Sequence, residues 1–337
     1  MKQISSSTLF LVAIFAILGV IPFVANPYLL YVANLTLIYI ILSLGLNLLV
    51  GYSGQLAFAN AAMFGIGAYT AGLLQVRLGV PYWMALPCAG FMAMAIGTII
   101  TWPALRLSGI YLALATLAFA QFTLWVFLNV EVLTFGATGF PVPRLSFAPL
   151  PISTAHGVYF LAWICAILLT VAAWGIIHSR IGRAFVAMRD NELAADALGV
   201  DLLRYKTLAF ALSGFYAGIA GGLFCALLNY VAPESFDLFQ MVMHKAMIIV
   251  GGLGSVAGSV IGAVALVAML EGLREFKSLQ EIAFGIVLLL FILFMPMGIV
   301  SYLKRLWPSW REGLHRHDDG GDTQPPVRAG QASEEAR

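Results

Sequence analysis

The sequence predicts an all-α polytopic membrane protein, and three observations lead to that prediction. Of the 337 residues, 61% are hydrophobic and only 10% are charged, whereas an average soluble domain is about 25% charged. The net charge is only +2, and the charged residues cluster at the two ends and in a few short segments. The intervening apolar stretches reach the length of about 20 residues that a helix needs to cross a bilayer. A soluble globular domain is therefore excluded.

About eight apolar segments predict spanning helices. The first follows a short basic start and is not followed by an A-x-A cleavage site, so we interpret it as a span rather than as a signal peptide. The distribution of Lys and Arg favours cytoplasmic N- and C-termini. With this orientation, alternating spans place thirteen basic residues on the cytoplasmic side and five on the external side. The predicted spans are 8–25, 29–50, 56–76, 82–103, 109–129, 157–177, 207–229 and 282–300.

A further apolar stretch, 241–270, is too long for an ordinary span and predicts a broken or re-entrant helix. Lipid cannot satisfy the free N–H and C=O groups of a break, so the break belongs to the protein interior. The orientation above requires this stretch to re-enter from outside. Lys245, beside His244, is the main intramembrane charge, and we expect it to snorkel toward the external face. The residues that interrupt the stretch are Gly251, Gly252, Gly254 and Ser255.

Two polar segments are candidates for function. Gly51 to Gln55 separates two apolar segments, and it is either a place where a helix unwinds to meet a solute or a plain turn. The loop 178–206 is the most polar internal segment, and it predicts a short amphipathic helix that Gly199 ends. Such a helix lies on the lipid surface or docks into a soluble partner, and the acidic residues in the loop favour the partner. The apolar positions of this helix are Leu193, Ala194, Ala197 and Leu198.

The polar tail, the absence of a phosphate loop, the cysteines and the net charge indicate the domain organisation and exclude several functions. We predict one transmembrane domain, 1–306, followed by a disordered tail, 307–337, because the polar tail cannot bury a core. No phosphate loop is present, so ATP is not bound by that route. The three cysteines lie in apolar segments without a CxxC pair, which predicts neither a redox nor a metal site. The weak charge gives no reason to expect nucleic acid.

Four blocks resemble the signature blocks of the branched-chain amino acid ABC-transporter permeases of the LivM type. They are GYSGQLAFANAAMFGIGAYTAGLL, SGIYLALATLAFAQF, GRAFVAMRDNELAADALGVDLLRYKTLAFALSGFYAGIAGGL, and PESFDLFQ followed by GGLGSVAGSVIGA. The resemblance implies a non-enzymatic inner-membrane subunit that imports branched-chain or other small amino acids. It also implies a second related permease subunit, two cytoplasmic ATPase subunits that bind ATP and Mg, and a periplasmic substrate-binding protein. No cofactor is expected on this chain. Membrane lipid is expected to contact the surfaces that the partner proteins do not cover.

The resemblance assigns roles to residues of the two polar segments and of the glycine break. The chain departs from the usual pattern at 57–60, at Gln121 and at Lys245, which leaves urea, short amides or another small organic solute as alternative cargo. An ion-coupled secondary transporter is a more remote alternative. The implied translocation-path residues are Gly51, Tyr52, Gly54, Gln55, Asn60, Gly251, Gly252 and Gly254, and the implied ATPase-coupling residues are Arg183, Arg189, Glu192, Ala195 and Gly199.

Overall fold

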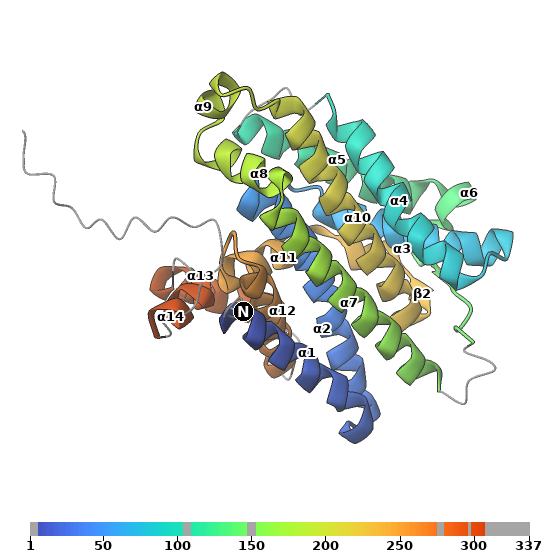
Figure 1. Ribbon diagram of the computed structural model, residues 1–337. Helices are drawn as coiled ribbons and strands as arrows, with labels where there is room; N and C mark the ends of the chain where they lie inside the picture. Colours follow the sequence, from blue (N-terminus) through green and yellow to red (C-terminus); the bar gives the residue numbers. More distant parts are fainter. Residues whose placement is uncertain (1–5, 104–108, 147–152, 275–279, 296–297, 307–337) are drawn as a thin grey trace, which may run out of the picture.

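The computed structural model describes residues 6–103, 109–146, 153–274, 280–295 and 298–306, and this part of the chain is predominantly helical (Figure 1). The all-α prediction is therefore confirmed. The predicted tail, 307–337, lies outside the described residues. The helices are α1 (Ser6–Val24), α2 (Pro27–Asn47), α3 (Asn60–Leu78), α4 (Tyr82–Thr101), α5 (Ile110–Asn129), α6 (Glu131–Thr134), α7 (Thr154–His178), α8 (Arg180–Asp190), α9 (Glu192–Ala197), α10 (Leu202–Leu228), α11 (Leu238–Gly251), α12 (Val256–Gly272), α13 (Gln280–Phe294) and α14 (Gly298–Leu306).

A helix occupies each of the eight predicted segments, namely α1, α2, α3, α4, α5, α7, α10 and α13. Five stretches in the described part of the chain are long and apolar enough to cross a membrane: Pro27–Tyr52, Tyr82–Ile99, Ile110–Asn129, Thr154–His178 and Leu202–Leu228. The chain is thus a polytopic membrane protein, and the number of eight spans stays a prediction.

The last predicted span, 282–300, is wrong as a single helix. α13 ends at Phe294, and α14 begins at Gly298, whose φ is +75°. A Cβ atom at Gly298 would lie 2.6 Å from the Cα atom of Gly252, so only glycine allows this approach. The chain therefore turns where it meets the glycine break of the α11–α12 segment.

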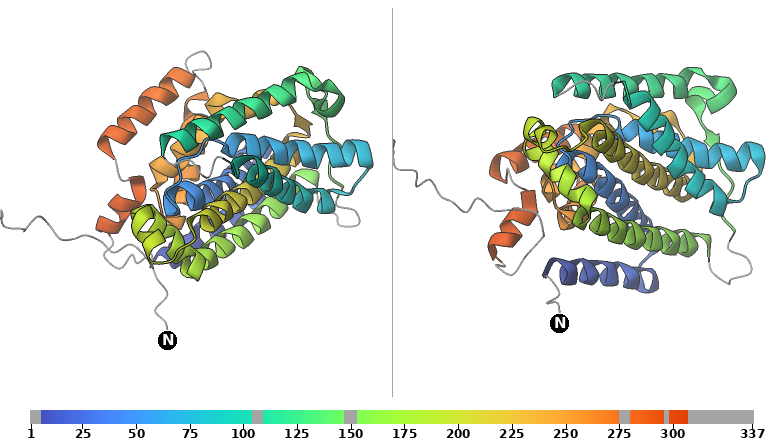
Figure 2. Two further views of the ribbon diagram at one scale, coloured as in Figure 1. Left: turned by 90° about the horizontal axis from the view of Figure 1, so that it is seen from above. Right: turned by 45° about the horizontal axis from the view of Figure 1, so that its top comes forward.

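α10 is the central helix of the bundle and packs against α2, α3 and α4. Glycines make this close packing possible, as is common between membrane helices. A Cβ atom at Gly221 would lie 2.0 Å from the carbonyl oxygen of Phe64 on α3, and one at Gly218 would lie 2.5 Å from that of Ala89 on α4. In contrast, α1 and α5 lie at the outer edges of the bundle (Figure 2).

The bundle has two distinct ends, which we name by what they carry. The loop end carries α8 and α9, and the strand end carries the antiparallel pair β1 (Phe140–Pro141) and β2 (Tyr230–Val231) (Figure 1). Phe140 pairs with Val231 in this short ladder. The strand pair joins the segment after α5 to the end of α10, so it ties together two parts of the chain that are 90 residues apart.

The predicted break in the apolar stretch 241–270 is confirmed. α11 ends at Gly251, α12 begins at Val256, and the two helices pack side by side as a hairpin. A Cβ atom at Gly262 would lie 1.9 Å from the carbonyl oxygen of Met247, which shows how closely the two backbones approach. At the far end of α12, Arg274 contacts Tyr28 near the start of α2. The hairpin thus leaves the strand end, turns at the loop end and returns.

Candidate coupling and translocation site

Asn47, at the end of α2, joins that helix to the turn of the α11–α12 hairpin. Its Oδ1 accepts a hydrogen bond from the backbone N–H of Gly254 at 2.9 Å. Its Nδ2 donates to the backbone oxygen of Ser255 and to Oγ of Ser259, both at 2.7 Å. Ser43, one turn earlier, donates to the backbone oxygen of Ser259 at 2.9 Å. These contacts are buried, and the bond from Gly254 to Asn47 satisfies a backbone N–H group that the break leaves free.

Gly51 lies directly against this junction. The chain around it, Leu48–Tyr52, forms a short π-helix, a feature that is frequent at functional sites. A Cβ atom at Gly51 would lie 1.8 Å from Oδ1 of Asn47 and 2.4 Å from the backbone nitrogen of Gly254. The two predicted glycine segments, around Gly51 and around Gly254, are therefore in direct contact although they are about 200 residues apart in the sequence.

Most of the predicted translocation-path residues are buried within this chain. Asn60, at the start of α3, is 4% exposed, and neither atom of its side-chain amide has a hydrogen-bond partner in the described protein. Gly54 is exposed and has a φ of +72°, which glycine tolerates without strain. The buried members of the set are Gly51, Tyr52, Gln55, Asn60, Gly251, Gly252 and Gly254. Their role in translocation stays a prediction.

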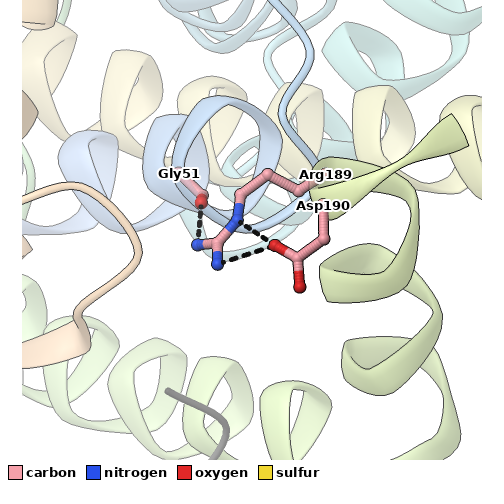
Figure 3. Close-up of polar contacts among 3 residues, drawn as sticks. All are labelled: Gly51, Arg189 and Asp190. Atoms are coloured by element: carbon pink, nitrogen blue, oxygen red, sulfur yellow. Dashed lines mark hydrogen bonds and ion pairs between the residues drawn. The ribbon is translucent and has the colours of Figure 1, made fainter. Parts of the chain in front are cut away.

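Arg189, at the end of α8, connects the long loop to the Gly51 segment. Its Nη1 donates to the backbone oxygen of Gly51 at 3.1 Å, and its Nε and Nη2 donate to Oδ1 of Asp190 at 3.3 and 3.2 Å (Figure 3). A Cβ atom at Gly54 would lie 2.9 Å from Cγ of Arg189. The arginine thus links the C-terminal end of α8 to the π-helical turn.

Glu192, the first residue of α9, makes the second connection. Its Oε1 accepts from Nε2 of Gln55 at 3.0 Å, and its Oε2 accepts from Nζ of Lys206 on α10 at 2.8 Å. Lys206 is only 4% exposed. Partial burial opposes ionisation of Glu192, but the hydrogen bonds from Lys206 and Gln55 and the charge of Lys206 outweigh it, so the pKa of this carboxyl lies below its ordinary value of 4.5.

A pH dependence follows from the lowered pKa of Glu192. A carboxyl whose pKa is lower in the folded than in the unfolded protein stabilises the fold above its unfolded pKa, and this stabilisation is lost as the pH falls through the folded pKa. We expect wild-type protein to have a higher thermal midpoint in detergent than Glu192→Gln at pH 7. The difference should shrink as the pH falls below 4.5. An equal difference at pH 7 and at acidic pH would contradict the prediction.

The other predicted coupling residues divide between the interior and the surface. Ala195 is 2% exposed, whereas Arg183 is exposed. Gly199, with a φ of +85°, ends α9 as predicted: the N–H of Val200 donates to the backbone oxygen of Ala195, the pattern of a Schellman C-cap. Leu193 and Leu198 are 84% and 85% exposed. The loop therefore presents two large apolar side chains outward, while Arg189 and Glu192 make inward contacts.

Comparison with known proteins identifies the family. The family model described as branched-chain amino acid transport system / permease component matches residues 28–296 of the 337-residue chain. The chain belongs to this permease family. The resemblance that the sequence blocks suggested is confirmed, and the protein is a multi-pass permease subunit of an ABC importer. Importers of this kind work with ATPase and substrate-binding partners.

Individual relatives agree with the family assignment. The permease is 35% identical over 321 residues to the high-affinity branched-chain amino acid transport system permease protein LivM of Escherichia coli K12. The matched region covers 88% of this chain and 75% of that protein. The permease has the same identity and coverage with the LivM protein of Salmonella typhimurium LT2. It is 27% identical over 290 residues to a probable branched-chain amino acid transport permease protein LivH of Methanocaldococcus jannaschii, with 79% and 91% coverage. No solved structure matches the permease significantly.

Sequence reasoning missed the polar residues that join the segments of the permease. Asn47, Ser43 and Ser259 were not singled out, and neither was Lys206. A signal for them exists: Ser43 and Asn47 are spaced by one helical turn within an apolar span, and so are Ser255 and Ser259 at the start of α12. Polar side chains at that spacing share one helix face and can meet a matching face on another helix.

The snorkelling of Lys245, on α11, toward the external face stays a prediction. Its ammonium lies over the ring of Phe58, 3.5 Å from the ring centroid. Phe58 belongs to the stretch between the π-helix and α3, near the loop end, because Gln55 of the same stretch contacts Glu192. A cation at the bilayer centre costs about 2.5–3.5 kcal/mol on insertion scales, and the ring face offsets part of this cost by roughly 0.5–2 kcal/mol.

Proposed function

We propose that this permease is one of two related membrane subunits of an ATP-driven importer for branched-chain amino acids in a bacterial inner membrane. A periplasmic protein would deliver the solute, and two cytoplasmic ATPase subunits would bind ATP and Mg. The chain itself would hold no cofactor and catalyse no reaction. The names of the relatives support the solute class, because the LivM and LivH proteins are described as branched-chain amino acid transport permeases.

The contacts of the loop end support a coupling role for 178–206. Arg189 bonds to the backbone of Gly51, and Glu192 bonds to Gln55, so α8 and α9 hold both ends of the Gly51–Gln55 segment. Gly51 in turn lies against Asn47, which bonds to the hairpin turn. A displacement of α9 by an ATPase would therefore be transmitted through a continuous set of contacts to the glycine break. This continuity is the observation that carries the proposal.

The distribution of basic residues supports cytoplasmic termini and a cytoplasmic loop end. The loop helices α8 and α9 with the start of α10 carry Arg180, Arg183, Arg189, Arg204 and Lys206. The positive-inside rule counts such short loops between spans. With the loop end inside, the exposed Leu193 and Leu198 face the compartment that holds ATP, where a soluble partner can cover them.

Uptake in proteoliposomes tests the proposal directly. The chain, co-expressed with its partner subunits, is reconstituted, and uptake of labelled leucine and of labelled urea is measured with and without ATP on the ATPase side. We expect leucine uptake that requires ATP, the partners and the binding protein. Uptake of urea instead would change the solute class but keep the importer. Uptake by this chain alone, driven by an ion gradient, would refute the importer.

Replacing the two exposed leucines tests the docking role of α9. We expect Leu193→Ser with Leu198→Ser to reduce co-purification of the ATPase subunits by about tenfold, because two exposed apolar side chains are the ordinary anchors of a groove. The thermal midpoint of the permease should not fall, since neither side chain is buried. The matched control is Ala194→Ser with Ala197→Ser, which changes the small apolar positions of the same stripe but keeps both leucine anchors, and it should retain most of the ATPase. Equal retention by both double variants would contradict the prediction.

A further inference from the structure

One face of α11 combines exposed apolar side chains with a single cation. Leu238 and Val242 are 52% and 41% exposed, and Lys245 and Ile249 are half-buried. Positions 238, 242, 245 and 249 are spaced so that they share one side of a helix. His244 lies on a buried side of the helix, where it is 1% exposed and its ring centroid is 5.5 Å from that of Phe64. Lys245 is thus the charged member of an otherwise apolar face.

The ammonium of Lys245 has no acidic partner in the described part of the chain. The described ion pairs join other residues, and none brings a carboxylate within 4.0 Å of Nζ. Its contact with Phe58 is through the ring face, which leaves N–H donors of the ammonium available. A charged group at membrane depth is normally paired or functional. The group that would pair with this ammonium is a carboxylate.

We infer that Lys245 binds the carboxylate of the transported solute during its passage through the permease. This inference rests on the proposed import of amino acids and names the residue that recognises their acid group. The surroundings fit such a solute, because the apolar side chains next to Lys245 on the same face suit an aliphatic side chain. A branched-chain amino acid offers a carboxylate and an aliphatic group within a few ångströms of each other.

The position of Phe58 supplies a means of release. Phe58 lies three residues after Gln55, which bonds to Glu192 of the coupling loop. Its own backbone N–H donates to Oγ1 of Thr116 on α5 at 2.9 Å. A movement of α9 that shifts the Gln55–Phe58 segment would change the contact between the ring and the ammonium. The ATPase cycle would therefore alter the strength with which Lys245 holds a carboxylate.

The test uses the assembled importer in proteoliposomes, with ATP on the ATPase side and saturating leucine-loaded binding protein on the other side. We expect Lys245→Met to lower the maximal rate of leucine uptake by about tenfold, the size of effect for a lost charge-assisted hydrogen bond. Lys245→Arg should keep most of the rate. The control is Leu168→Met on α7, an exposed apolar position outside this face, which keeps volume and charge and should transport normally. ATP hydrolysis stimulated by the loaded binding protein should persist in Lys245→Met.

The outcomes separate this inference from the proposed function. If wild-type importer takes up leucine and Lys245→Met does so at the same rate, the inference fails and the importer stands. If Lys245→Met loses the second permease subunit on purification, the ammonium pairs with a carboxylate of that subunit, which overturns the inference. ATP-driven uptake of urea but not leucine by wild-type protein also overturns it. Absence of any ATP-driven uptake by the wild-type complex refutes the proposed function itself.

Discussion

Replacing Gly51 by alanine is expected to disrupt the junction between α2 and the α11–α12 hairpin. The added Cβ atom would lie 1.8 Å from Oδ1 of Asn47 and 2.4 Å from the backbone nitrogen of Gly254. The neighbouring atoms include backbone, which cannot move aside as a flexible side chain can. Over-packing together with the loss of a buried hydrogen bond costs about 3 kcal/mol. We expect a lower thermal midpoint in detergent and a loss of ATP-dependent uptake.

Gly175→Ala is the matched control for Gly51→Ala. Gly175 lies within α7, and a Cβ atom there would meet nothing within 4 Å. The substitution adds the same methyl group at another helical glycine, so it should leave the thermal midpoint and uptake unchanged or slightly improved. If Gly51→Ala behaved like Gly175→Ala, Gly51 would not be the close contact that the structure describes, and the proposed transmission through it would fail.

Replacing Glu192 by lysine is expected to abolish energised uptake while the protein remains inserted and abundant. The substitution removes the acceptor of Gln55 and places a second cation beside Lys206, whose Nζ is now 2.8 Å from the Glu192 carboxylate. Because the Glu192 side chain is 36% exposed, solvent screens part of the repulsion. We therefore expect a small effect on global stability and a fall in the uptake rate of tenfold or more. A tenfold fall corresponds to an increase of about 1.4 kcal/mol in the activation free energy of transport.

Asp196→Lys provides the control for charge. Asp196 is exposed on the same short helix and undergoes the same change of charge, but none of the described ion pairs involves it. We expect its uptake to stay close to that of wild type, while ATP hydrolysis by the Glu192→Lys complex continues without transport. Equal losses in the two variants would assign the effect to the net charge of the loop and not to the contacts of Glu192.

The sequence predicted the local features of this permease well, because each depends on neighbouring residues. Apolar runs of spanning length indicated where helices form, and a helix occupies each predicted segment. Glycine clusters indicated the break after Gly251 and the end of α9 at Gly199, since glycine adopts backbone angles that end helices. The end of the last predicted span was wrong because α13 stops where Gly298 meets Gly252, a contact between segments distant in sequence.

Composition, the periodicity of apolar residues and the four motif blocks by themselves determined that this protein is an all-α membrane permease, and they predicted which segments carry its function. The tertiary structure alone decided how those segments meet. Asn47 reaches a break more than 200 residues away, Glu192 turns inward to Gln55, and Lys245 lies over Phe58. Hydropathy records which side chains avoid water, but it carries no information on which distant polar atoms become partners. That choice depends on close helix packing, which brings particular backbones within hydrogen-bonding distance.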